Sequence, residues 1–286
     1  TALTSAGALP TNEDHCATIK TSDAALLVLA DGAGGHAGGE VASKIVVDEC
    51  MRFFKAQEEI IPGPAVVVQA LRAAQTALRE EISRTRKLAD MRSTGLVVLA
   101  ERDGFWVGHV GDSRAYLIRA GQARRLTVDD TLVQALVSAG SIAPDAGQKH
   151  SQSHVLLQCL GQKGELEFHV TERVETQPGD VLVACSDGLT EVVSDEEIAR
   201  VASTGTGEQI AERLMTLAAD NKVRDNVTVS AMNWRERSAL PSAVARSRQP
   251  ARPGRRRPRG DRRLFLAVAT LGVLAVVLLA IYARLR

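Results

Sequence analysis

Five aspartates stand at the edges of short apolar runs, most of them beside glycine, asparagine or serine. They are Asp14 in TNEDHC, Asp31 in LADGAGG, Asp112 in HVGDSRAY, Asp187 in CSDGLTE and Asp225 in VRDNVTV. A single aspartate in such a place is usually a turn or cap residue. Five of them restrict the fold more strongly, because carboxylates at the same ends of several strands can converge on one point. Unpaired, they would repel one another and raise each other's pKa.

A divalent cation would remove this repulsion. An oxygen-only ligand set without a Cys or His motif favours a hard cation such as Mg²⁺ or Mn²⁺. The glycine-rich stretch ADGAGGHAGGE at 30–40 would let backbone carbonyls and waters join the ligands of Asp31. It lacks the Gly-Lys-Ser/Thr ending of a phosphate-binding P-loop, so a metal site is the better interpretation. Two ions bridged by one carboxylate and holding a water can hydrolyse a phosphate ester.

The first 234 residues alternate short apolar runs with helical patterns. We expect strands at 24–30, 93–100, 105–110, 115–119, 180–186 and 227–233, with Asp103-Gly104 as a hairpin turn. We expect helices at 36–57, 64–88, 131–140, 195–201 and 207–220. Helices among hairpin-linked strands predict an α+β domain built in layers.

The last 52 residues differ from the rest in composition. Residues 235–286 hold 13 of the 35 basic residues, all of them arginine, and only two acids, although the whole chain has a net charge of +1. The segment 264–282, LFLAVATLGVLAVVLLAIY, has no charge and no proline, and its length suits a single transmembrane helix. The preceding residues 235–263 are rich in Arg, Pro, Ser and Ala, which predicts a flexible linker.

The arginines also predict an orientation in the membrane. Most of them precede the apolar segment, and only Arg284 and Arg286 follow it. By the positive-inside rule, residues 1–234 would lie in the cytoplasm of a bacterium, at its inner membrane. Nucleic-acid binding is the rival interpretation of the arginine run. Because the run lies beside the apolar segment, contact with anionic lipid headgroups is the favoured interpretation. We therefore expect no nucleic-acid partner.

Several motifs in order resemble the protein phosphatase 2C family, the metal-dependent Ser/Thr phosphatases, in its bacterial form. They are NED (12–14), LADGAGGHAGGEVAS (29–43), STG (93–95), GHVGDSRAYLIR (108–119), LTVDDTLVQALVSAG (126–140), CSDGLTEVVSDEEI (185–198) and RDNVTV (224–229). The resemblance covers about residues 1–234. It implies an antiparallel β-sandwich flanked by pairs of helices, with Mn²⁺ or Mg²⁺ at one end as two or three ions.

The resemblance also implies roles for single residues. Asp31 would bridge two metals, and the Gly32 carbonyl would bind the second. Asp187 and Asp225 would complete the first metal site, and Glu13 would sit at the second with Asp14 beside it. Asp112 would hold a third ion together with Asp187. Asn226 and His36 are neighbours of the site, Asn226 as a support for the local turn and His36 as a functional group or only the start of a helix. Histidines 109, 150, 154 and 169 are interpreted as structural.

Some positions depart from the family pattern. The family places an arginine about three residues before NED, where it grips the substrate phosphate, and here Leu9 stands near that position. Ala33 stands where some members have a histidine. The family's DHS motif reads Asp129-Asp130-Thr131, and Gln158 replaces an arginine in HSQSHVLLQCLG.

The sequence therefore leaves two functions open. The first is a membrane-tethered phosphatase that uses a metal-activated water on phosphoserine and phosphothreonine of proteins, with a Ser/Thr kinase or its substrates as partners. The second is a weakly active or inactive binding and regulatory module, because the phosphate-gripping arginine is absent.

Overall fold

The computed structural model describes residues 1–34, 38–57, 63–143, 150 and 152–234. The predicted linker (235–263), the predicted transmembrane segment (264–282) and His36 lie outside these residues. In the part that is described, none of the helices combines the length and the apolar character that crossing a bilayer requires.

The described strands form two antiparallel sheets. One sheet has the order β1-β12-β11-β7-β8 and the other the order β10-β6-β5-β3-β2, with β4 beside β3 and β9 beside β6. The first sheet consists of β1 (Ala2–Ser5), β12 (Val227–Asn233), β11 (Val181–Cys185), β7 (Arg114–Arg119) and β8 (Gln122–Arg125). The second consists of β2 (Asp14–Lys20), β3 (Ala25–Ala33), β4 (Arg92–Ser93), β5 (Gly95–Ala100), β6 (Gly104–Val110), β9 (His169–Val170) and β10 (Val174–Glu175).

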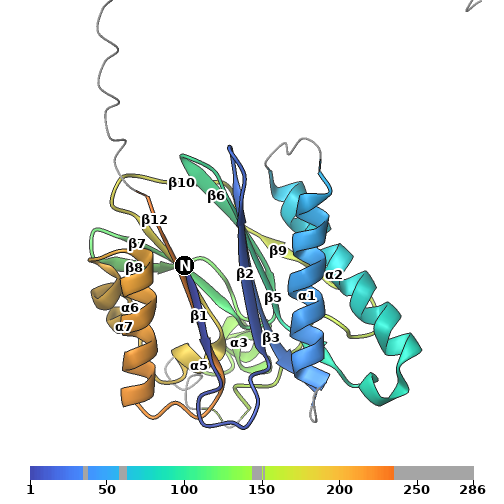
Figure 1. Cartoon of the computed structure of the whole chain (residues 1–286). Helices are drawn as coiled ribbons and strands as arrows, with labels where there is room; N and C mark the ends of the chain where they lie inside the picture. Colours follow the sequence, from blue (N-terminus) through green and yellow to red (C-terminus); the bar gives the residue numbers. More distant parts are fainter. Residues whose placement is uncertain (35–37, 58–62, 144–149, 151, 235–286) are drawn as a thin grey trace, which may run out of the picture. The chain divides into compact units, whose positions relative to one another are not determined.

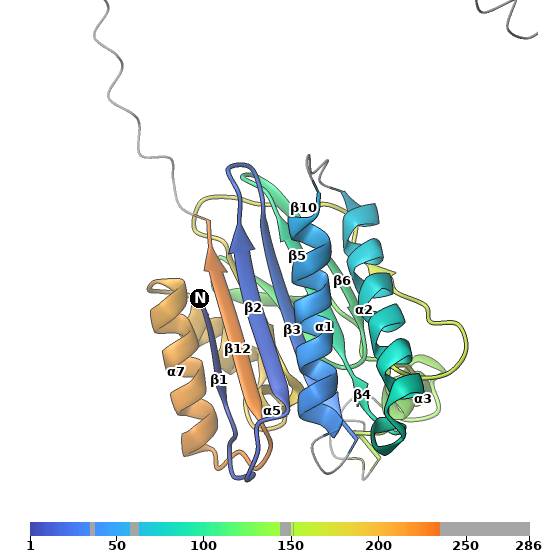
Figure 2. The same cartoon turned by 45° about the vertical axis from the view of Figure 1, so that its right-hand side comes forward.

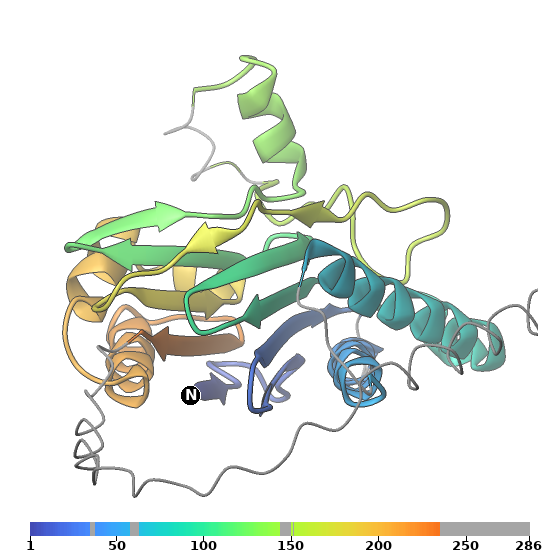
Figure 3. The ribbon, with the colours of Figure 1, turned by 90° about the horizontal axis from the view of Figure 1, so that it is seen from above.

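A pair of helices covers the outer face of each sheet. Helices α1 (Gly38–Lys55) and α2 (Pro64–Arg84) pack on the second sheet, and α6 (Asp195–Ala202) and α7 (Gly207–Asp220) on the first (Figure 1). Figure 2 shows α1 and α2 side by side along their sheet. Viewed from above, the two pairs lie on opposite sides of the sheets (Figure 3). The shorter elements are the 3-10 turn η1 (Arg86–Leu88), α3 (Leu132–Ser138) and α5 (Asp187–Thr190).

Three apolar clusters explain these layers. One joins α1 and α2 to the second sheet, through residues such as Val46, Leu71 and Val97. Another joins α6 and α7 to the first sheet, and the third lies between the two sheets, where Leu29 and Leu182 are fully buried. Strands β5 and β6 are buried on both faces, as their continuous apolar runs predict. The predicted antiparallel sandwich with flanking helix pairs is confirmed for these residues.

The predicted helices and strands correspond to observed elements, with different ends. The helix expected at 64–88 ends at Arg84 and continues as η1, and the strand expected at 93–100 is divided into β4 and β5. We did not predict β1, β2, β8, β9 and β10. Strands β9 and β10 have two residues each, and β8, with the sequence QARR, lies at a sheet edge and has no exclusively apolar face.

Strand register brings the five aspartates to the same end of both sheets. Asp14 begins β2 and is the direct antiparallel partner of Asp31 near the end of β3. Asp187 follows β11 and Asp225 precedes β12, and these two strands are antiparallel neighbours. Asp112 lies in the connection by which β6 of one sheet leads into β7 of the other. The β7 residue Arg114 pairs with Cys185 at the end of β11, so this connection passes the same end.

Candidate metal centre

Asp31 and Asp187 lie at the middle of the carboxylate cluster, one from each sheet. They are close enough that each carboxyl group affects the pKa of the other. Burial raises the pKa of Asp31 well above its ordinary value, and the negative charges of Asp187, Asp14 and Asp112 raise it further. Burial also raises the pKa of Asp187, and the charge of Asp225 adds to this effect. Without a cation, the fold therefore favours the protonated form of these two carboxyl groups.

Asp14 is the most enclosed of the five, with 2% of its surface exposed. Its Oδ2 accepts a hydrogen bond of 2.7 Å from the Ser186 hydroxyl, which in turn accepts one of 2.9 Å from the Thr228 amide. Burial, as the largest cause, raises the pKa of Asp14 to about 6. Its Oδ1 is buried and has no hydrogen-bond partner among the described residues. A buried oxygen of this kind is costly unless a cation or an ordered water satisfies it.

Glu13 and the Gly32 carbonyl meet beside Gly39, near the start of α1. A Cβ atom on Gly39 would lie 2.1 Å from Glu13 Oε2 and 2.7 Å from the Gly32 carbonyl oxygen. Only glycine lets α1 approach the two oxygens this closely. Burial raises the pKa of Glu13, and the charges of Asp225 and Glu40 raise it further. Glu13 and Gly32 thus add two oxygens beside the aspartate cluster.

Asn226 positions Asp225 and Glu13 and is itself almost fully buried. Its side-chain amide donates to the carbonyls of Ala6 and Thr11, at 3.0 Å each, and its Oδ1 accepts from the Glu13 amide at 2.7 Å. Its own backbone N–H donates to Asp225 Oδ1 at 2.7 Å. These bonds fix the N-terminal loop against Asp225, in keeping with the supporting role expected for Asn226.

Asp112 joins the cluster from the β6–β7 connection and is 8% exposed. Burial raises its pKa well above the ordinary value, and the charges of Asp187 and Asp129 add to this. The hydroxyls of Thr94 and Ser113 are 2.8 Å apart, and Thr94 also accepts a bond of 2.9 Å from the Asp31 amide. This link holds the β6–β7 connection against β3.

The donor set fits divalent cations. Four aspartates with raised pKa share one end of the sandwich, and Asp225 and Glu13 adjoin them. The nearby Arg114 bonds to Asp129 instead, from Nη2 to Oδ2 at 2.7 Å and from Nε at 3.2 Å, and its charge only partly offsets the raised pKa of Asp112. Carboxylate and carbonyl oxygens of this number suit Mg²⁺ or Mn²⁺. All seven residues predicted as metal ligands thus lie at this end of the fold: Glu13, Asp14, Asp31, Gly32, Asp112, Asp187 and Asp225.

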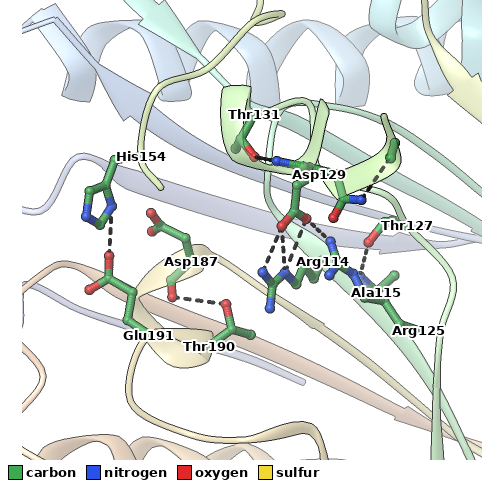
Figure 4. A network of polar contacts seen from close by, with 12 residues as sticks. Arg114, Ala115, Arg125, Thr127, Asp129, Thr131, His154, Asp187, Thr190 and Glu191 are labelled. Atoms are coloured by element: carbon green, nitrogen blue, oxygen red, sulfur yellow. Dashed lines mark hydrogen bonds and ion pairs between the residues drawn. The ribbon is translucent and has the colours of Figure 1, made fainter. Parts of the chain in front are cut away.

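A cavity of about 540 Å³ opens beside this centre, and Asp112 and Asp187 line it. Its wall includes Asp129, which binds both Arg114 and Arg125 (Figure 4). It also includes His154 and Glu191, which the sequence reasoning did not place at the site. Glu191 could have been identified as a neighbour of the site from its spacing, because residues four positions apart, such as Asp187 and Glu191, share a helix face. His154 comes from a separate segment, so only the fold brings it here.

The structure also shows what surrounds the missing arginine. Leu9 is 44% exposed, in the loop that Asn226 ties against Asp225. Arg52 pairs with Glu49 toward the far end of α1, about 20 Å along the helix from Gly39. Arg114 is held by Asp129. Neither of these two arginines takes the place of the missing phosphate contact.

Comparisons with known proteins agree with this geometry. Residues 10–227 match the family model of protein phosphatase 2C. The chain is 37% identical over 209 residues to the serine/threonine protein phosphatase PstP of Mycobacterium tuberculosis, covering 72% of this chain and 40% of that protein. It is 30% identical over 223 residues to the serine/threonine phosphatase stp of Listeria monocytogenes, covering 76% and 88%. The crystal structure of the PstP catalytic domain in complex with two manganese ions superposes with a TM-score of 0.71 and 32% identity, covering 82% of this chain and 96% of that one.

Proposed function

Because the chain belongs to the protein phosphatase 2C family, we propose that it hydrolyses phosphoserine and phosphothreonine in proteins. The observation that carries this proposal is the convergence of Asp14, Asp31, Asp112, Asp187 and Asp225 at one end of the two sheets. Buried carboxylates with raised pKa destabilise a fold when they are ionised, unless a cation compensates their charge. Phosphatases of this family use Mn²⁺ or Mg²⁺.

The residues at the site have separable tasks. Asp31, Asp187 and Asp225 would hold the ions, together with Glu13 and the Gly32 carbonyl. When bound, the ions lower the pKa of a coordinated water and neutralise charge on the phosphate. Asp14 Oδ1 remains able to accept a hydrogen bond from a water at the site, because only Oδ2 is engaged, by Ser186. Asn226 keeps Asp225 and Glu13 in place through its backbone and side-chain bonds.

The absence of an arginine at Leu9 favours a slower enzyme. A hydrogen bond to a charged group is worth about 1.5–3 kcal/mol, and the loss of such stabilisation lowers a rate by about 10²-fold. An exposed apolar side chain in the loop beside Asp225 offers no replacement. This observation supports the second candidate, a weakly active or inactive binding and regulatory module built on the same fold.

We further propose that residues 264–282 tether the domain to the cytoplasmic face of a bacterial membrane, where it opposes a Ser/Thr kinase. The support is the uncharged apolar segment and the arginines that precede it. Tethering raises the effective concentration of partners at the same membrane.

The test of the activity uses the full chain and a phosphothreonine peptide. We expect phosphate release with Mn²⁺ or Mg²⁺ and none with EDTA. Asp187→Asn should lower turnover by at least about 100-fold, because it removes a metal ligand. Asp48→Asn is the matched control, since Asp48 is an exposed aspartate that pairs with Lys44 on α1. Metal binding without turnover in the unmutated chain would favour the regulatory module, and turnover in EDTA would contradict both candidates.

A further inference from the structure

One histidine faces the carboxylates from outside the oxygen-only set. His154 Nδ1 lies 3.1 Å from Glu191 Oε1. One ligand atom each from His154, Asp187 and Glu191 lies within 4.8 Å of the other two. Figure 4 shows the imidazole and the Glu191 carboxylate facing each other, with Asp187 beside them. This cluster is the starting point of the inference.

Two independent chain segments build the cluster. Asp187 begins α5, and the Glu191 amide donates 2.9 Å to the Asp187 carbonyl, so the two carboxylates lie one helical turn apart. His154 comes from the segment that follows α3. The Leu132 amide donates 2.9 Å to the Val155 carbonyl, which attaches this segment to the start of α3. The imidazole is therefore carried by a piece of chain with its own anchor.

A simple ion pair does not account for all three groups. The His154 side chain is 65% exposed and that of Glu191 is 31% exposed, and an exposed pair adds about 0–1 kcal/mol at most. The pair joins only two of the three groups, whereas the imidazole also lies close to the Asp187 carboxylate. An imidazole nitrogen and two carboxylates, in contrast, are a familiar ligand set for Zn²⁺. Nitrogen is also the donor that separates Zn²⁺ sites from the oxygen-only sites of Mg²⁺ and Mn²⁺.

We propose that His154, Asp187 and Glu191 form an additional metal site. It binds a divalent ion that prefers imidazole ligands, such as Zn²⁺. A tetrahedral zinc holds its ligand atoms about 3.3 Å apart, so the three groups need to close by at most about 1.5 Å. Two of the three side chains are partly exposed and can make this adjustment. The cavity of about 540 Å³ that all three line leaves room for a water as fourth ligand and for entry of the ion.

This site differs from the oxygen-only ligand pairs of the metal centre. Asp187 belongs to both ligand sets, but His154 and Glu191 belong only to the new one. Asp112 lines the same cavity and is the oxygen partner that the family resemblance assigns to Asp187. Substitution of Asp112 should therefore affect the oxygen-only site and leave the nitrogen-containing one in place.

The experiment measures Zn²⁺ binding to the full chain, in competition with a chromophoric chelator and in excess Mg²⁺. We expect His154→Ala and Glu191→Gln each to lower the affinity for one equivalent of zinc by at least about tenfold. The matched control is His150→Ala, which should change that affinity by less than about threefold. His150 comes from the same segment, and its Nδ1 is occupied by the Gln152 amide at 3.2 Å.

Equal zinc affinity in the unmutated chain and in His154→Ala would overturn the proposal. So would an equal loss in His150→Ala, because any histidine of the segment would then suffice. Circular dichroism of each variant separates a lost ligand from a lost fold. The readout is binding, so it does not depend on turnover: His154-dependent zinc binding by a chain without phosphatase activity would refute only the proposed function.

Discussion

Leu9 stands near the position where the family pattern expects a phosphate-binding arginine. We expect Leu9→Arg to raise kcat/KM for a phosphothreonine peptide by about 10- to 100-fold, because it restores a charge-assisted phosphate contact. The loop already lies against Asp225, so the new side chain would start close to the metal centre. Steady-state kinetics with Mn²⁺ measures the effect.

Leu9→Gln is the control for this substitution, since it removes the exposed apolar side chain without adding a charge. An equal gain in Leu9→Gln would assign the effect to solubility of the loop. No gain in Leu9→Arg would mean that the phosphate does not approach this loop at all.

The convergence of the aspartates could be predicted residue by residue, because each of them follows or precedes a recognisable apolar run. The approach of His154 to Asp187 could not be found in this way. The two residues are far apart in sequence, and their contact depends on how the segment after α3 is anchored. Asp14 was predicted, but its degree of burial was not, because that depends on the sheets packing over it.

At the scale of elements, the close contact of α1 with β3 depends on Gly39. Alanine normally stabilises a helix relative to glycine by about 0.5–1 kcal/mol. At Gly39 the added Cβ would meet Glu13 Oε2 and the Gly32 carbonyl. We therefore expect Gly39→Ala to destabilise the fold by about 1–3 kcal/mol and to weaken Mn²⁺ binding. Urea unfolding and a metal titration measure the two effects.

Gly63→Ala is the matched control, because Gly63 precedes α2 and a Cβ there would meet no atom within 4 Å. Unchanged stability of Gly39→Ala would show that α1 can move away from β3 at no cost. In that case the geometry of the Glu13 and Gly32 oxygens would not be set by this helix.

The strands β1 and β2 were not predicted for the same physical reason. Strands β5 and β6 are buried on both faces, so they can be recognised in the sequence as continuous apolar runs. Strand β2, with the sequence DHCATIK, is the last strand of its sheet and stays partly exposed along much of its length. Strand β1 is also an edge strand, and it pairs only with β12, more than 220 residues away along the chain. Edge strands depend on tertiary pairing more than on their own sequence.

For the whole molecule, the predicted tether can be separated from the catalytic domain. Each arginine in the middle of an apolar span opposes membrane insertion by about 2.5–3.5 kcal/mol. We expect the full chain to remain in the membrane fraction after a carbonate wash, and the double variant Leu274→Arg, Val277→Arg to be released. Leu264→Arg, at the end of the segment, should stay in the membrane. Recovery of the unmutated chain in the soluble fraction would contradict the tether.

The metal centre should also couple the stability of both sheets to pH. The pKa of Asp14 is about 6 in the fold, above its ordinary value of 3.8. Its contribution to stability is therefore fully present below about pH 4 and is lost as the pH rises through about 6, at a cost on the order of 3 kcal/mol. Asp31, Asp112 and Asp187 have raised pKa values as well, so their effects have the same sign. We expect the metal-free chain to melt at a lower temperature at pH 7 than at pH 5.

Mn²⁺ should reverse this dependence, because the ion binds the ionised carboxylates and its affinity rises as they lose their protons. Melting curves recorded between pH 4 and 8, with EDTA and with saturating Mn²⁺, test the reversal. Asp14→Asn should flatten the metal-free curve, whereas Asp23→Asn, an exposed control, should leave it unchanged. If the metal-free chain were most stable at pH 7, protein groups would already compensate the carboxylates. A cation would then not be needed to hold the two sheets together at this end.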